Sequence, residues 1–561
     1  MKNRYTLITA ALLCLCSCSL KEQPQGYVTR ENFYRTESQC NSALRGCYTP
    51  IHYIYNHQFM MAVEGCTDLW FCNTSDVNAT LAVTPASCGV ATNVWNYGYK
   101  GVARANECVE CIAASPLDEA VKLPLVAEAR AMRALYYYIL TSFFGGVPFY
   151  TESVSDIAAM EHVRTLPRTP APEIRAALYN DLKDNAIPYF TEANGLKCRA
   201  NQVASQHAGY ALSLMLMAKF AVWDKKWDDA LYALDLLEET YGEFSEAAFP
   251  LEKVQWRHKN TDEGIFEIQH EWSVNGVKFY GNVSGLMSPR CTGKGVYDGV
   301  YMPELSANGS NSTPLKVTKH FALFRSANGS KTENAANRNG IFRAVPMKFT
   351  NDTYLFDKKK GIYRYCTIID ADALSSGVTA NGSALDRRIA YTIGMGRIET
   401  AETFATVRNG GFFFGGPKFW CLGMTATYDS NNYRIFRYAD AVLLKAESLL
   451  GKGSPEEAVK YLNLVRRRAG IPDFSYTDDA ALLAEIQNER ARELGGEFQR
   501  KFDLVRWGIW FDVTKKWNEE ARLKSNIRRC HEYYPIPDTE CGLSGGVLTN
   551  DAYVDEPVEN E

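Results

Sequence analysis

Apolar residues recur every three to four positions over long stretches of this 561-residue chain. That period is typical of amphipathic helices that pack against one another. It predicts strong helices over residues 31–55, 93–114, 123–144, 172–190 and 478–511. The aromatic run of Tyr136, Tyr137 and Tyr138 with Phe143 and Phe144 lies in the middle of one predicted helix, and we interpret it as core.

Two segments far apart in the chain share one pattern. They read "AKFAVWDKKWDDALYALDLLEE" from position 218 and "AESLLGKGSPEEAVKYLNLVRR" from position 446. Each predicts an apolar helix, a tight turn at 225–226 or 453–455, and a second, amphipathic helix. Ala230 and Ala458 are small enough to let the two helices of each pair approach closely. The pattern resembles the helix-turn-helix unit of tetratricopeptide repeats.

Between residues 252 and 432 the helical periodicity fades. Gly, Asn and Ser accumulate there, with "SANGS" at 306 and 326 and "TANGS" at 379. Because Asn-Gly favours turns with positive φ, we expect loops and short strands inserted into a helical frame. Loops held on a rigid scaffold often carry function. We therefore expect a helical part over 31–251, a loop-rich ligand-binding lobe over 252–432, and a C-terminal helical part and tail over 433–561.

The N-terminus predicts export. Lys2 and Arg4 precede an apolar run over 7–15, which is shorter than the ~20 residues of a membrane-spanning helix. A basic start, a short apolar run and small residues describe a secretory signal. The stretch 15–18, "LCSC", resembles the lipobox of bacterial lipoproteins, in which the family's cysteine receives lipid. Cys18 fits that position better than Cys16, so we expect a signal peptide over 1–17 and a lipidated tether over 18–30. An ordinary signal peptide with chance cysteines is the alternative.

Composition narrows the function classes. The net charge is −4 and no long basic run occurs, which argues against nucleic acid as the main partner. No second apolar stretch is long enough to span a bilayer. Of sixteen cysteines, thirteen are left beyond position 18. A chain of this length does not need disulfides for stability, so we expect mostly buried thiols with at most a bridge or two. Cys108 and Cys111 fit one helix better than a redox motif.

The segment "ERARELGGEFQRKFDLVRW", from position 489, carries acids and bases at helical spacings. A glycoside hydrolase would need two of these carboxylates facing one sugar bond. An ion-pair ladder explains them better, because Glu497 and Lys501 are four residues apart and Asp503 and Arg506 three. Nearby bases would also keep the carboxyl pKa values low. "GLSGG" at 542 lacks the strand and helix of a nucleophile elbow. The eight histidines show no ligand-like cluster, so no catalytic residue, metal or cofactor is predicted.

The content of ten Trp and thirty-two Tyr residues favours a binding function instead. Sugar rings present C–H faces that stack on aromatic planes, while amide and guanidinium groups bond hydroxyls at the edges. The predicted ligand-binding residues are Trp70 and Asn73 in "CTDLWFCNTSDVN", and Trp272, Tyr280, Arg290 and Tyr297 in and after "IFEIQHEWSVNGVKFYGNVSGLMSPR", with Tyr301 extending the region. For each residue alone, packing in the core is an equal alternative. As a group they favour a site.

Several segments together resemble one family along nearly the whole chain. "NFYRTESQCNSALRGCYTPI", "WNYGYKGVARANECVECI" and "AEARAMRALYYYILTSFFGGVPFYTE" are followed, in order, by "FRYADAVLLKAESLL", "LNLVRRRAGIP", "IQNERARELGGEFQRKFDLVRWG" and "YYPIPDTE". This ordered set is similar to the SusD/RagB family of outer-membrane nutrient-binding lipoproteins. The tail departs from the family, because Cys541 and "GLSGG" replace an Asn-rich ending. A local disulfide there is one consequence to test.

The resemblance implies a mainly α fold: a superhelix of tetratricopeptide-like helix pairs with an inserted loop-rich, short-strand ligand-binding lobe. It also implies a lipid-anchored protein on the extracellular face of a Gram-negative outer membrane. Such proteins capture glycans and deliver them to a TonB-dependent transporter of the SusC type. Peptide capture, as in the RagB branch, is the first alternative. A surface glycoside hydrolase and a helical scaffold that binds only proteins are less favoured.

Overall fold

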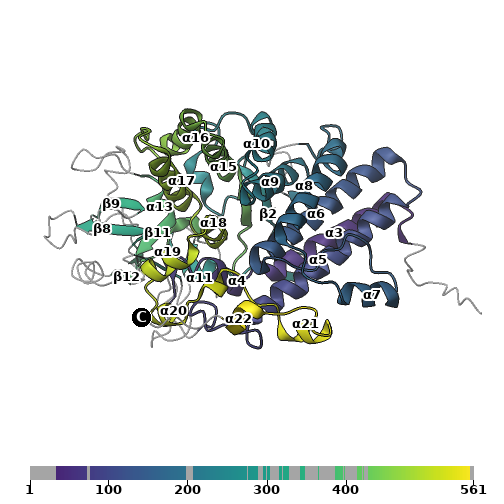
Figure 1. The fold of residues 1–561 in the computed structure, drawn as a ribbon. Helices are drawn as coiled ribbons and strands as arrows, with labels where there is room; N and C mark the ends of the chain where they lie inside the picture. Colours follow the sequence, from purple (N-terminus) through teal and green to yellow (C-terminus); the bar gives the residue numbers. More distant parts are fainter. Residues whose placement is uncertain are drawn as a thin grey trace, which may run out of the picture.

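The computed structural model describes residues 33–72, 76–197, 206–274, 276–287, short stretches between 295 and 421, and 428–555. The helices stand side by side in a row, in which each packs on the next along the chain (Figure 1). The row consists of α3 (Glu37–Ile54), α5 (Gly89–Ala113), α6 (Glu119–Phe144), α8 (Ala171–Asn185), α9 (Tyr210–Trp223), α10 (Trp227–Tyr241), α15 (Tyr438–Gly451), α16 (Pro455–Arg468) and α17 (Asp479–Leu494). This arrangement confirms the predicted fold class.

The two predicted repeats are helical hairpins. α9 packs on α10, and α15 on α16, and the second hairpin continues the row because α10 also contacts α15. The turns fall where the sequence placed them: Lys225 has φ 55° and Gly453 has φ 82°. Ala230 and Ala458 are both fully buried, as close helix crossing requires. The repeat therefore marks two structural units of one superhelix.

α6 is the centre of the N-terminal half. Its Tyr136, Tyr137 and Phe144 side chains are completely buried, which confirms that the aromatic run is core. A Cβ on Gly101 of α5 would lie 2.3 Å from the Tyr136 ring. Glycine at that position therefore lets α5 approach α6, and the Tyr136 hydroxyl donates a hydrogen bond to the Cys47 carbonyl of α3 at 2.5 Å. The three helices form one packed unit.

Most of the described cysteines are buried, as predicted. Cys47 of α3 and Cys108 of α5 are free thiols whose sulfurs lie 3.6 Å apart. Cys541 is also a free thiol, so the tail has no disulfide at that residue.

The predicted helix over 478–511 is wrong in its continuity. It is three helices: α17, α18 (Arg500–Arg506) and α19 (Trp510–Trp517). Gly496 has φ 81° and Phe498 has φ 63°, and this left-handed backbone cannot continue a right-handed helix. Predicted helix 31–55 begins later, at Glu37, because Thr36 and Gln39 form a capping box.

A buried antiparallel ribbon joins the two halves of the row. β2 (Gly264–Ile268) follows α10 and pairs with β14 (Tyr433–Arg437), which leads directly into α15. Every residue of both strands is buried. The two strands therefore lie together, although a long segment of sequence separates them.

The other described strands are short, and all of them except β1 lie between β2 and β14 in the chain. β1 (Trp70–Phe71), β7 (Lys316–Val317), β13 (Phe413–Gly415) and β11 (Ile393–Met395) form one antiparallel sheet. The paired strands are β3 (Glu271–Val274) with β4 (Val277–Phe279), β5 (Gly295–Tyr297) with β6 (Val300–Met302), β8 (Ala322–Ser326) with β9 (Phe342–Met347), and β10 (Arg364–Tyr365) with β12 (Arg397–Ile398).

Short helices complete the described chain. They are α4 (His57–Val63), α7 (Ile157–Arg164), α11 (Ser284–Met287), α13 (Ile389–Thr392), α20 (Ala521–Asn526), α21 (Asp538–Leu543) and α22 (Asp551–Asp555), with 3-10 turns at Ile187–Tyr189, Leu251–Val254, Pro417–Phe419 and Arg529–Glu532. Within the described residues, no helix has the length and apolarity needed to cross a membrane.

Candidate functional site

Trp70 is not a surface platform, and that prediction is corrected. Its side chain is fully buried in β1. The indole packs edge-on against Phe321 and Phe419, with ring centroids 5.6 and 6.1 Å away. No face of the ring is left for a sugar, so Trp70 belongs to the core.

Several predicted site residues lie outside the described residues. They are Asn73, Arg290 and the lipidation residue Cys18. The backbone of Tyr297 lies in β5 and that of Tyr301 in β6, but their side chains are outside the description as well. Their roles stay predictions.

Trp272 and Tyr280 lie on one hairpin, formed by β3 and β4. Trp272 is half-buried on β3, and Tyr280 directly follows β4. The Tyr280 ring lies 4.3 Å from the ring of Tyr428, which is 44% exposed. Phe279, the neighbour of Tyr280, is 36% exposed. We call these four residues, Trp272, Phe279, Tyr280 and Tyr428, the hairpin surface.

The hairpin surface joins the end of α3. The Phe279 ring lies 4.4 Å from the ring of His52, near the C-terminus of that helix. The next residue, Tyr53, is 51% exposed and stacks on Tyr97 of α5 at 4.5 Å with an interplanar angle of 10°. Exposed aromatic rings therefore gather where α3, α5 and the hairpin meet.

Sequence reasoning missed Phe279, Tyr428 and Tyr53. Tyr428 and Tyr280 come together only because the chain folds back between distant segments, and no local pattern reports that contact. Phe279 was visible in the sequence as an aromatic beside Tyr280, in "KFYGN". Adjacent aromatics before a Gly-Asn turn were the available signal.

Hydrogen bonds and close packing hold the backbone that follows the hairpin in place. Gly281 and Asp429 exchange two backbone hydrogen bonds, of 2.8 and 3.0 Å. A Cβ on Gly281 would lie 1.9 Å from the Tyr433 hydroxyl, so only glycine lets the chain cross this ring. The Asp429 carboxylate accepts hydrogen bonds from Ser284 N at 2.9 Å and from the Tyr433 hydroxyl at 3.1 Å. These bonds position Tyr280 and Tyr428 together.

Polar groups border the aromatic rings. The Asn282 amide oxygen accepts a hydrogen bond from the exposed His57 backbone at 3.0 Å, and its Nδ2 lies 3.1 Å from His57 Nδ1. At the start of the hairpin, Lys259 Nζ donates to Glu271 Oε1 at 2.6 Å. Aromatic residues accompanied by amide, ammonium and carboxylate groups suit a sugar, whose C–H faces stack on rings and whose hydroxyls form hydrogen bonds.

The histidines beneath the hairpin are uncharged at neutral pH. Burial lowers the pKa of His52 to about 4 and that of His270 to about 3. The His270 ring packs 4.3 Å from the Tyr433 ring. This support is apolar in character, so the surface above it does not depend on a histidine charge.

The carboxylates of the predicted ion-pair ladder lie in the core. Arg437 Nη1 donates to Glu493 Oε1 at 2.6 Å, and Arg437 Nε donates to Glu497 Oε2 at 2.9 Å. Arg468 and Arg388 also pair with Glu493. Burial raises the pKa of Glu493, but the three guanidinium groups outweigh it and hold this pKa well below its usual range. These acids are paired within the protein and carry no proton to donate.

One predicted pair of the ladder is confirmed and the other is wrong. Asp503 and Arg506 pair at 2.9 Å, as the three-residue spacing predicts. Glu497 instead pairs with Lys418 at 2.5 Å and with Arg437, while Lys501 donates to the His531 carbonyl at 2.8 Å. Glu497 lies between α17 and α18, so the four-residue spacing of a helix does not apply to it.

Comparisons of the sequence with known families match two parts of the chain. Residues 422–553 match the model of the SusD family, and residues 35–208 match a model described as "Starch-binding associating with outer membrane". A SusD-like protein of Formosa agariphila is 23% identical over 592 residues, which cover 98% of this chain and 99% of that protein. The starch-binding protein SusD of Bacteroides thetaiotaomicron is 30% identical over 132 residues, 23% of each chain.

Solved structures share the fold. A SusD homolog from Bacteroides thetaiotaomicron superposes with a TM-score of 0.65 at 18% identity, covering 92% of this chain and 97% of its own. Surface glycan-binding protein A from the same organism, in complex with laminarihexaose, gives a TM-score of 0.61 at 18% identity, with 91% and 98% covered.

Proposed function

This chain belongs to the SusD family, and we propose that it captures glycan oligosaccharides at the hairpin surface without cleaving them. The observation that carries this proposal is the group of exposed aromatic rings, Phe279 and Tyr428 with half-buried Trp272 and Tyr280, held on a rigid frame. Such rings contribute little to the core. Their value is a set of flat apolar faces beside polar groups.

A structural relative supports glycan over peptide as the ligand. Surface glycan-binding protein A, with the same fold, is known in complex with laminarihexaose. Asn282, Lys259 and Glu271 around the hairpin surface suit hydroxyl groups, which both donate and accept hydrogen bonds. Arg290 and Tyr297 follow this hairpin in the sequence, so we propose that both residues complete the same site, with Asn73 as a further contact.

Capture for import also requires release, so we expect modest affinity. A Kd between micromolar and millimolar corresponds to about −8 to −4 kcal/mol. An array of neutral and acidic glycans, laminarihexaose among them, with peptides of matched length, tests the ligand class. Binding of one glycan series without chain shortening supports the proposal. Binding of peptides alone would contradict glycan capture and favour a peptide-binding role, as in the RagB branch. Release of new reducing ends would show that the protein cleaves glycans and is an enzyme.

We further propose that Cys18 carries the lipid that anchors the protein at the outer surface of the outer membrane. The supporting observation is the lipobox-like sequence "LCSC" after a short apolar run. Bacterial lipoprotein cysteines carry more than one acyl chain, and each buried methylene contributes about 0.8 kcal/mol. Cys18→Ala should release full-length protein from the membrane fraction. Release by Cys16→Ala instead would reassign the anchor.

The proposed partner is a TonB-dependent transporter of the SusC type, which the protein covers as a lid. Gentle detergent extraction should recover a β-barrel partner in one-to-one proportion. Crosslinking in intact cells provides the control, because it does not depend on detergent. A chain that is recovered alone by both methods would contradict the lid role.

A further inference from the structure

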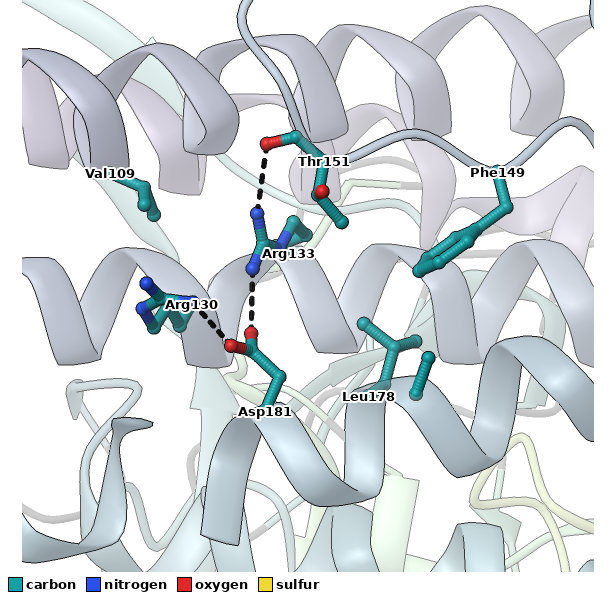
Figure 2. Close-up of a pocket in the computed structure, with 8 residues that line it drawn as sticks. Val109, Arg130, Arg133, Phe149, Thr151, Leu178 and Asp181 are labelled. Carbon is teal, nitrogen blue, oxygen red and sulfur yellow. Dashed lines mark hydrogen bonds and ion pairs between the residues drawn. The ribbon is translucent and has the colours of Figure 1, made fainter. Parts of the chain in front are cut away.

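A cavity of about 340 Å³ lies between α5, α6 and α8, next to the segment 149–151 (Figure 2). Its volume is at the lower end of the range for small-molecule sites, with room for one sugar or amino-acid residue. Its apolar lining residues are Val109, Phe149 and Leu178, and its charged wall consists of Arg130, Arg133 and Asp181. In Figure 2, Val109 lies on the same side as Arg130, while Phe149 and Leu178 lie on the opposite side, with Arg133 and Asp181 between them.

The charges of this cavity do not balance. Arg133 Nη2 donates to Asp181 Oδ2 at 2.6 Å, and Arg130 pairs with the other oxygen, Oδ1. Asn185 Nδ2 donates to that same oxygen at 3.2 Å. One carboxylate therefore serves two guanidinium groups and a neutral amide. The charged wall keeps one net positive charge.

The two arginines are held differently. Arg133 is 3% exposed, and its Nη1 also donates to Asn106 Oδ1 and to the Thr151 carbonyl, both at 3.1 Å. Arg130 is 23% exposed, and Asp181 is its ion-pair partner. Each arginine also has a buried Nε–H without an acceptor. Arg133 is therefore a fixed part of the wall, while Arg130 has donors in reach of a molecule in the cavity.

Burial lowers the pKa of Arg130, and the Asp181 carboxylate does not fully offset this, because Arg133 lies beside it. An additional anion would stabilise both charged groups. Guanidinium groups bind carboxylates through paired N–H donors, which gives geometry as well as attraction.

We propose that this cavity is a second binding site, which takes a small carboxylate such as an acidic sugar or an acidic amino acid. The carboxylate lies on Arg130, with the positive charge of Arg133 beside it, and the body of the molecule packs against Phe149 and Leu178. The site is separate from the hairpin surface, because Val109 lies about 18 Å further along α5 than Tyr97. It goes beyond the proposed capture of glycans and does not depend on it.

Matched probes test the charge. D-glucuronate and D-glucose share one ring and differ in the carboxylate, and N-acetylglutamate and N-acetylglutamine differ in the same way. Calorimetry on the full chain should show binding of at least one acid and of neither neutral molecule at the same concentration. The acid that binds identifies the source of the carboxylate. Equal binding of an acid and its neutral match, or binding of none, overturns the proposal.

Variants test the residues. Arg130→Gln should weaken binding of the acid at least ten-fold, and Arg130→Lys should weaken it less. Asp181→Asn should tighten binding, because it removes the competing carboxylate, whereas a merely structural ion pair would give no such gain. Arg164→Gln is the control, since Arg164 forms an exposed pair with Glu161 on α7. If Asp181→Asn does not fold, the affinities of the other proteins decide: they should fall from the native protein to Arg130→Lys and further to Arg130→Gln. Equal affinities of these three proteins overturn the proposal.

Discussion

Two regions of this molecule differ in whether their side chains find partners within the protein. In the buried network around Glu493, acids and arginines from β14, α16 and α17 saturate one another out of reach of water. At the hairpin surface, aromatic rings keep exposed faces above a packed base. The contrast shows that the type of a residue does not tell whether it stabilises the fold or lies at a candidate binding surface. The exposure of the side chain and its contacts within the protein do tell, and they differ even between two tryptophans, Trp70 and Trp272.

A substitution in the buried network should lower the free energy of unfolding more than any other change considered. Glu493→Ala removes the acid shared by Arg388, Arg437 and Arg468, so that each of these buried guanidinium groups loses one of its carboxylate partners. Loss of one member of a buried pair costs about 3–5 kcal/mol. Urea unfolding measures the loss. Glu457→Ala is the control, because its exposed pair with Lys460 contributes little, about 0.5 kcal/mol or less. Equal effects of the two substitutions would contradict the account of the network.

Trp70 is a buried aromatic residue that can be compared with the aromatic residues of the hairpin surface. Trp70→Ala should lower the unfolding free energy by about 3 kcal/mol, since it leaves a cavity between Phe321 and Phe419. Trp70→Phe should cost clearly less, because it keeps an aromatic ring in place. A Trp70→Ala protein of native stability would return this residue to the list of surface candidates.

Two buried glutamates should respond to pH in opposite directions. Burial raises the pKa of Glu64 from 4.5 to about 8, so the contribution of this group to stability is fully present below pH 4.5, falls as the pH rises, and is lost above pH 8. Glu493 has a lowered pKa, so its contribution is lost on acidification instead. From pH 6 to 9, Glu64→Gln should gain about 2.7 kcal/mol of stability relative to the native chain. A constant difference across this range would show that Glu64 is ionised throughout.

The smallest expected effect on stability belongs to the hairpin surface. Trp272→Ala should change the unfolding free energy by about 1 kcal/mol or less, because the residue is half-buried on a short hairpin. Thermal unfolding beside Trp70→Ala gives the direct comparison. A loss as large as that of Trp70→Ala would make Trp272 a packing residue.

The helical row was predictable because its signals are local. Turn residues and periodicity placed the hairpins at Lys225 and Gly453, and both turns have the expected left-handed backbone. The pairing of Glu497 was not predictable, since the left-handed Phe498 ends the helical spacing on which the expected contact with Lys501 relied. Long-range partners such as Arg437 arise only when β14 and α17 come together.

The site was predictable in part. Trp272 and Tyr280 were expected in a loop after a strand, whereas the structure places Trp272 on β3 and Tyr280 directly after β4 of the same hairpin. The same reasoning chose Trp70, because a short polar context says nothing of the strand pairing and the two Phe rings that bury it. The division of the chain at 252 and 433 and the roles of Asn73, Arg290 and Tyr297 stay predictions.

Calorimetric titration of Trp272→Ala with the glycan that the array identifies tests the central claim most directly. Loss of one stacking plane should cost about 2 kcal/mol, a roughly thirty-fold weaker Kd, with stability close to native. Tyr280→Ala should follow it, while Trp70→Phe should bind as the native protein does. Normal binding by both hairpin variants, with loss in Trp70→Phe, would contradict the account and place the ligand elsewhere.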